Sequence, residues 1–411
     1  MKLKFFKTIA IFLVAALGSC IYKYEADIES LGLPTSLVTI EGDIIVGDTT
    51  IINIGYSHKA VTKSSSVHYD TYWQEKSASV WIEDENGNTW WGKDTLINVH
   101  YVKDDYYNGI SKYKPALQWR YFIDTRDLDI NGKYRLCVSI PERGEYVTPF
   151  KNVLIAQDID SLSYIVEPDR TNVHIMVSSS GKDGQSQYYR WHYREDWEND
   201  PPVMPQVIYD LRENDLYSLG REYKDSLSRC MSFSNSYEIL LENTGHLEQN
   251  RLVNYRIISF PTKSRRMVGL YCFTLYQTPL DKDGYDFYKA MAVNDDLGGL
   301  YAPYPNDIIG NISSTTNSSE TVLGYINVCT RSKKRVFVDG YKLKFIDRNE
   351  CTRERKVIGK SDWMREYYKD MRPYDYYRDN DSTHWKKAYW GSFFCYGIEV
   401  CAPRPYYWPK Q

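Results

Sequence analysis

The chain has 411 residues, a formal net charge of −3 and an aromatic content of 15%. A slightly acidic balance, without a basic patch interleaved with aromatic residues, argues against a nucleic-acid partner. The length predicts two or three domains at roughly 100–200 residues each.

The first twenty residues have the pattern of an export signal. Three lysines precede an apolar core at residues 9–17, which is too short for a bilayer that needs about 20 apolar residues. Leu17-Gly18-Ser19-Cys20 then places small residues before a cysteine, a pattern similar to the bacterial lipobox. We expect a lipoprotein signal peptide at 1–19, acylation of Cys20 and a lipidated tether at 20–29. The alternative is an ordinary secretory signal in which this cysteine is incidental.

Runs of β-branched and alternating residues follow at short intervals, at 37–46, 50–54, 78–83 and 134–140. Two of these runs adjoin Asn86-Gly87 and Asn131-Gly132. Asn-Gly tolerates the positive φ angles that tight hairpin turns require. Short strands at this spacing predict an Ig-like β-sandwich over residues 30–155.

The strand pattern restarts after Ile159 and predicts a second β-rich domain over residues 156–348, with strands at 172–179, 188–193, 321–330 and 336–346. The basic residues at 331–335 are predicted to form a solvated turn. One helix is expected at 280–293, entered through Thr278 or Asp281. Its packing faces would carry Tyr285, Phe287, Tyr288 and Met291.

The remaining segment, 349–411, is predicted to be irregular and rich in aromatic residues and cysteine. From Trp363 onward, 15 of 49 residues are aromatic, and the prolines forbid long helices. One hypothesis is that the rings pack over the β domains. The other is that they face a sugar or a protein partner, through the candidates Tyr367, Tyr368, Trp385, Trp390, Tyr406, Tyr407 and Trp408.

The cysteines divide by their surroundings. Cys20 would carry the lipid, whereas Cys137, Cys272 and Cys329 lie in apolar strand-like runs and are predicted core residues. The disulfide candidates lie in polar, loop-like sequence, and their pairing stays open: Cys351, Cys395 and Cys401.

No catalytic pattern emerges from the motifs. The sequence lacks Gly-x-Ser-x-Gly, His-Glu-x-x-His and a phosphate loop. Asp127-Leu128-Asp129-Ile130-Asn131-Gly132 copies the opening of a calcium loop, but the twelfth position holds Val138 instead of a bidentate glutamate. A β-turn is therefore predicted there, and no catalytic residue, metal or cofactor is assigned.

Several short motifs together resemble a known family of Bacteroidota lipoproteins, domain-of-unknown-function family 4249. They are Leu37-Val38-Thr39-Ile40-Glu41-Gly42, Ile159-Asp160-Ser161, Tyr188-Tyr189-Arg190-Trp191, Tyr276-Gln277-Thr278, Pro305, Gly310-Asn311-Ile312 and Leu323-Gly324-Tyr325. The resemblance implies an outer-membrane lipoprotein associated with a TonB-dependent receptor, with no established catalytic residues. The residues after Cys20 leave open which face of the membrane it occupies.

The sequence thus predicts a mostly β protein with two β-sandwich-like domains, one short helix in the second and an irregular aromatic C-terminal segment. The expected function is non-enzymatic: an accessory binding component beside an outer-membrane receptor in nutrient capture or uptake. Two alternatives stay open, an envelope hydrolase acting on glycan or peptide, and a structural or assembly lipoprotein.

Overall fold

The computed structural model describes residues 37–56, 74–103, 113–182, 184–198, 201–211, 213–220, 231–297, 310–377, 387–397, 402 and 404–409. Cys20, Pro305, Trp385 and Cys401, and with them the predicted signal peptide and tether, lie outside the described residues. The described chain is mostly β, as predicted, with several antiparallel sheets and few helices. None of the described helices is long and apolar enough to cross a membrane.

Two sheets form the first sandwich around one apolar core. Val38, Ile40 and Ile52 point into this core, because alternate side chains of a strand face the same side. One sheet contains β1 (Val38–Ile45), β2 (Thr49–Tyr56), β5 (Lys93–Lys103), β6 (Tyr113–Asp124), β20 (Val322–Leu323) and β21 (Val328–Cys329). The other contains β3 (Ser79–Asp84), β4 (Thr89–Trp91), β7 (Lys133–Ile140), β8 (Gly144–Val147), β9 (Lys151–Asn152) and β19 (Ser313–Ser314).

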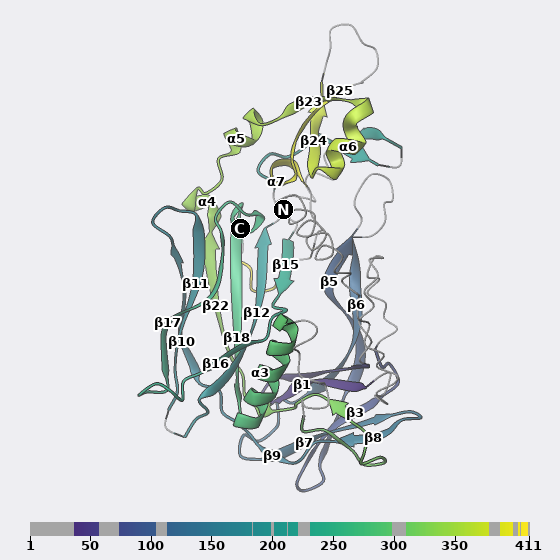
Figure 1. Cartoon of the computed structure of the whole chain (residues 1–411), viewed down its shortest axis with the longest axis vertical. Coiled ribbons are helices and arrows are strands. Elements are labelled where there is room, and N and C mark those ends of the chain that lie inside the picture. The colour runs from purple at the N-terminus through teal and green to yellow at the C-terminus, as the bar shows by residue number, and fades with distance from the viewer. Residues whose placement is uncertain are drawn as a thin grey trace, which may run out of the picture.

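The second sandwich encloses a separate core, to which Ile175, Trp191 and Phe273 contribute. One of its sheets has the order β10 (Asp158–Val166), β11 (Asn172–Ser180), β17 (Arg251–Pro261). The other has the order β15 (Met231–Asn235), β12 (Tyr188–Glu198), β18 (Leu270–Leu280), β22 (Ser332–Asp339), with β16 (Leu240–Asn243) also paired to β12. The short helix η3 (Arg265–Met267) precedes β18. In Figure 1 the second sandwich stands on the left and the first at the lower right.

The chain returns to the first sandwich after building most of the second. β20 and β21 pair in parallel with β1, and β19 pairs with β8. Residues 156–348, which the sequence groups as one domain, therefore supply strands to both sandwiches. Pairing between segments so distant in the chain leaves no local sequence pattern, so the sequence alone does not reveal it.

The predicted helix is present as α3 (Lys282–Leu297), displaced by a few residues. Leu280 still belongs to β18. The side chain of Asp281 accepts a hydrogen bond from the Gly284 amide at 2.8 Å, which satisfies one free donor of the first helical turn. Figure 1 shows α3 against the second sandwich and near β1.

Two local predictions meet different outcomes. The Asp127–Gly132 string contains a β-turn, as predicted, in which the Gly132 amide donates to the Asp129 carbonyl at 3.0 Å. The solvated turn predicted at 331–335 is wrong, because Ser332 already begins β22. Its basic groups are used by the fold: the ammonium of Lys334 donates to the Ile159 carbonyl at 2.8 Å.

The C-terminal segment holds more regular structure than the sequence suggests, because its rings form a small core around which short elements pack. α4 (Gly340–Leu343) precedes the segment and α5 (Arg348–Arg353) begins at its first residues. The segment continues with β23 (Lys356–Gly359), η5 (Lys360–Asp362), α6 (Trp363–Tyr368), β24 (Met371–Tyr376), β25 (Lys387–Ser392) and α7 (Phe393–Tyr396). β23, β25 and β24 form a small sheet, and Pro373 is accommodated beside an irregularity in β24.

We call residues 348–397, with the hairpin of β13 (Val207–Asp210) and β14 (Asp215–Ser218), the C-terminal module. The hairpin belongs to it because Val207, Tyr209 and Leu216 share its core. The module lies at the top of Figure 1, apart from the core of the first sandwich.

Candidate functional site

The structure does not gather the aromatic candidates of the C-terminal segment into one surface. Tyr367 and Trp390 are buried in the core of the C-terminal module, against Tyr209 of the β13–β14 hairpin. Tyr368 and Tyr406 are 70% and 89% exposed. Tyr368 lies on α6 of the C-terminal module, whereas Tyr406 contacts the ring of Tyr407 in residues 404–409.

Tyr407 and Trp408 cover the outer face of the second sandwich. The hydroxyl of Tyr407 donates to Asp196 at 2.5 Å, and the indole of Trp408 donates to Glu198 at 3.2 Å. Burial and the neighbouring Asp196 carboxylate raise the pKa of Tyr407. These rings therefore cover buried carboxylates of β12 instead of facing a ligand.

The cysteines of the described chain fall into two groups. Cys351 and Cys395 form a disulfide, which ties α5 to α7 within the C-terminal module. Cys137, Cys272 and Cys329 are free and buried, so the prediction of core positions is confirmed. Burial raises the pKa of the Cys272 thiol to about 12, which keeps it protonated and unreactive.

A second region of the molecule combines buried charge with a cavity. We call it the junction, where β1, β12, α3 and residues 323–327 meet. Its central contact is an ion pair between Arg190 of β12 and Asp43 of β1, and both residues are buried. Asn327 donates a hydrogen bond to Asp43 at 3.2 Å. The guanidinium of Arg190 also lies 4.1 Å from the ring centre of Tyr288 on α3, so one arginine links three elements.

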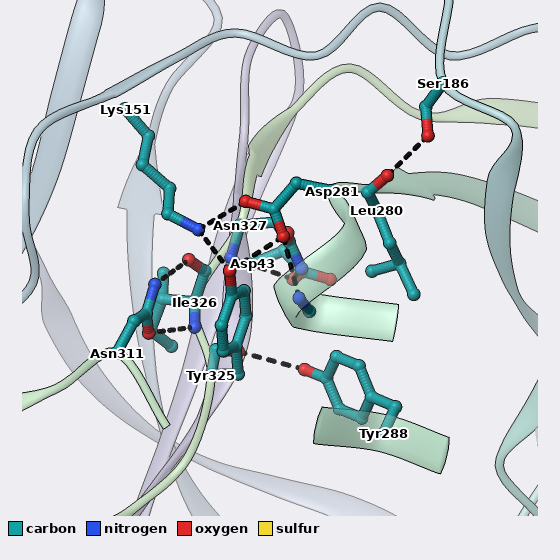
Figure 2. A network of polar contacts seen from close by, with 11 residues as sticks. Asp43, Lys151, Ser186, Leu280, Asp281, Tyr288, Asn311, Tyr325, Ile326 and Asn327 are labelled. Carbon is teal, nitrogen blue, oxygen red and sulfur yellow. Dashed lines mark hydrogen bonds and ion pairs between the residues drawn. The ribbon is translucent and has the colours of Figure 1, made fainter. Parts of the chain in front are cut away.

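A second polar cluster closes the junction beside the first (Figure 2). The ammonium of Lys151 lies 2.7 Å from Asp281 and donates to the Tyr325 hydroxyl at 2.7 Å. That hydroxyl in turn donates to Asp281 at 2.7 Å. Burial alone would raise the pKa of Asp281, but the bonds from Lys151 and Tyr325 hold the pKa below its ordinary value. The cluster therefore keeps a half-buried carboxylate ionised at the start of α3.

Two glycines allow close approach of neighbouring backbones around β1. Gly42 and Gly324 have φ angles of +142° and +143°, a region that side chains disfavour. A Cβ on Gly324 would lie 1.9 Å from the Ile40 carbonyl oxygen. Gly324 is therefore required where the returning chain passes β1, whereas a Cβ on Gly42 would lie 2.5 Å from the Ile51 carbonyl oxygen of β2.

A hollow of about 640 Å³ opens beside the junction, between β1, β12, α3, the β15–β16 loop and residues 323–325. Phe287 and Tyr325 are almost fully buried at its floor, and Met291 and Leu323 line it with partly exposed side chains. Glu41, Tyr237 and Glu238 are exposed and form its rim. The hollow therefore has an apolar floor and an acidic, aromatic rim.

His192 of β12 lies at the edge of the hollow. Surrounding protein atoms and the positive charges of Arg190 and Arg331 lower its pKa below the ordinary value, although the side chain is exposed toward the hollow. The imidazole is therefore neutral at physiological pH, and it offers the hollow a polar group without charge.

The family model of a domain of unknown function (DUF4249) matches residues 21–335. The chain belongs to this family. No curated protein matches the sequence. The family match contains both sandwiches as far as the first half of β22, together with the junction and its hollow, and it ends before α5 and the rest of residues 348–397.

Most of the motifs that carried the resemblance to the family lie at or beside the junction; Ile159-Asp160-Ser161 belongs to β10, and Pro305 lies outside the described residues. Arg190 comes from one motif, and Thr278 from another donates to the Arg190 carbonyl at 3.2 Å. Gln277, buried beside them, accepts from the Trp191 indole at 2.8 Å. Asn311 donates to the Ile326 carbonyl at 2.8 Å and so fixes the chain next to Asn327.

Sequence reasoning did not single out this region as a candidate site. Arg190, Gly42 and Gly324 were visible only as parts of family motifs, and Asp43 had no distinguishing signal. A search for motifs shared by distant segments could have grouped them. Within the described residues, no three His, Cys, Asp or Glu side chains gather as metal ligands would.

Proposed function

We propose that this protein is a non-enzymatic outer-membrane lipoprotein. In this proposal it binds a small ligand at the junction and works as an accessory component of a TonB-dependent receptor in nutrient capture or uptake. The hollow beside the two sandwiches is the observation that carries the proposal. Ligand sites occur preferentially at domain interfaces and have volumes of about 300–1,000 Å³.

The chemistry of the hollow supports binding. Most of its floor is apolar, from Phe287, Met291 and Leu323, and a few polar groups such as His192 and Ser236 could orient a ligand. This mixture of apolar surface with few polar groups is typical of small-molecule sites.

The walls of the hollow are held in place before any ligand arrives. The Arg190–Asp43 ion pair fixes β12 against β1, and the Asp281–Lys151 pair fixes the start of α3 against β9. Because these contacts already order the walls, ligand binding does not have to offset the conformational entropy cost of ordering them, which would lower the affinity.

The proposed anchor follows from the first twenty residues. Acylation of Cys20 would attach the protein to a membrane, and the tether would lead to the first sandwich, which supplies β1 to the hollow. A protein held in this way could present its ligand to a neighbouring receptor.

The direct test is a tagged pull-down from detergent-solubilised outer membrane of the native host. We expect one large TonB-dependent receptor to co-purify with the wild type. The matched control is Cys20→Ala, which should leave the membrane fraction. Recovery of the lipoprotein alone from well-solubilised membrane would contradict a stable receptor complex.

A further inference from the structure

We propose that the hollow at the junction selects an amphipathic organic cation, with its apolar body on the floor and its cationic head at the rim. This inference rests on the proposed binding function and names the chemical class of the ligand. The inference is drawn from the distribution of charged groups and of solvent-exposed side chains around the hollow.

The floor suits an apolar group. Phe287 and Tyr325 pack together with ring centres 5.7 Å apart, and the partly exposed Leu323 lies beside them in the lining. Met291 of α3 also lines the hollow and is partly buried. Methionine packs against irregular shapes and aromatic rings because its side chain is flexible and polarisable.

The rim carries two carboxylates and an exposed ring. Tyr237 is 74% exposed and adjoins Glu238 on the β15–β16 loop. Glu41 reaches the hollow from β1. A cation placed over an aromatic face is attracted by the electron density of the ring, and carboxylates add a direct charge attraction.

The cationic group that lines the hollow is already compensated. Among the described residues of the lining, Arg190 is the only lysine or arginine, and it is paired with Asp43 and stacked on Tyr288. His192 is neutral at physiological pH. An anionic ligand would therefore be repelled by the rim carboxylates, above all by Glu238, whereas a cation would be attracted.

The two carboxylates differ in their surroundings. Glu41 accepts a hydrogen bond from Asn53 at 3.2 Å, and Arg120 lies near enough to interact with its charge. Glu238 forms no ion pair with another residue in the part of the chain that the structure describes. Glu238 should therefore contribute more of the attraction than Glu41.

Three probes of similar size and different charge test the inference. They are 4-phenylbutyl-trimethylammonium, neutral 4-phenylbutanol and anionic 4-phenylbutanoate, titrated calorimetrically at low salt into the full mature chain carrying Cys20→Ala, which needs no detergent. We expect the cation to bind at least about tenfold more tightly than the anion and several-fold more tightly than the alcohol. Raising the salt concentration should weaken the binding of the cation selectively, because the rim is exposed to solvent.

Substitutions locate the effect. Glu238→Gln should weaken cation binding about three- to tenfold and leave alcohol binding unchanged, with a smaller effect for Glu41→Gln. The matched control, Glu145→Gln, alters an exposed carboxylate on β8 and should change nothing. Met291→Trp, which fills the floor, should weaken all three probes.

The outcomes separate the two proposals. Equal or tighter binding of the alcohol or the anion would overturn the cation assignment, as would failure of all three probes to bind at millimolar concentration. Full cation affinity in the Glu238→Gln variant would overturn it as well. None of these results bears on the receptor complex, which the pull-down tests independently.

Discussion

Two regions of this protein are rich in aromatic rings and use them in opposite ways. In the C-terminal module, Trp363 and Trp390 are fully buried and form the centre of a small core. At the junction, Tyr237 and Tyr288 line a hollow together with charged groups. In the C-terminal module, the high density of aromatic residues therefore reflects core packing. At the junction, the candidate site arises where segments distant in the chain meet.

The physical reason lies in the size of each core. The module is small and builds its interior from large rings, since each ring buries a large area. A disulfide assists it, as is common in small units with limited cores. The sandwiches have cores of their own, so the rings between them are available to shape a cavity.

The largest effect is expected from breaking the Arg190–Asp43 ion pair, which tests whether this pair stabilises the junction. Arg190→Met leaves the Asp43 carboxylate buried without its partner and should lower the free energy of unfolding by about 3–5 kcal/mol. Urea denaturation followed by tryptophan fluorescence measures this. The control is Lys263→Met, which breaks an exposed pair with Glu350 and should cost less than about 1 kcal/mol. Equal midpoints for both variants would contradict a structural role for the Arg190 pair.

The next effect tests whether the two regions are independent. Replacing Cys351 and Cys395 together by serine should destabilise the C-terminal module by about 2–4 kcal/mol, since the unfolded segment gains freedom. Hydrogen exchange should increase in β23–β25 and stay unchanged in β1 and α3. A reductant should reproduce the effect in the wild type and have none in the variant. Equal loss of protection at the junction would show that the regions are coupled.

A glycine substitution tests the close approach of the chain at the junction. Gly324→Ala should destabilise the protein by about 1–3 kcal/mol, because its φ of +143° is strained for alanine and the Cβ would meet the Ile40 carbonyl. Gly359→Ala is the control, since Gly359 has a φ of −76° and room for a Cβ. Thermal unfolding compares the two. A Gly324→Ala variant as stable as the control would contradict the packing described at this point.

The smallest effect concerns pH. The pKa of Asp281 is lowered in the folded protein, so its ionised form stabilises the fold above about pH 4, and that contribution is lost as the pH falls further. Asp281→Asn should cost less than about 1 kcal/mol at pH 7, because the pair with Lys151 is partly exposed. The difference between the urea midpoints of wild type and variant should therefore shrink as the pH is lowered from 7 through 5 to 3.5. A difference between the two midpoints that grows toward pH 3.5 would contradict the lowered pKa of Asp281.

Local patterns allowed much of the fold to be predicted. The alternation at 37–46 and 134–140 corresponds to β1 and β7, and Asp281 correctly indicated the start of α3. These features are set by neighbouring residues, whose side chains alternate along strands or cap a helix. The predicted strand at 336–346 extends too far, because Asp339 caps the short helix α4.

The candidate site could not be predicted in the same way. Asp43, Arg190 and Asn327 become neighbours only when β21 returns to β1. The pairing of Cys351 with Cys395 likewise depends on the fold of the module. Composition drew attention to the aromatic tail, but burial of its rings follows from tertiary packing that no single segment encodes.

The most direct test of ligand binding at the junction is hydrogen exchange with and without whichever of the three probes binds most tightly. Binding at the junction predicts added protection in residues 236–241 and 285–293, and none in 363–376. Protection confined to the C-terminal module would contradict this and return the ligand to the aromatic segment.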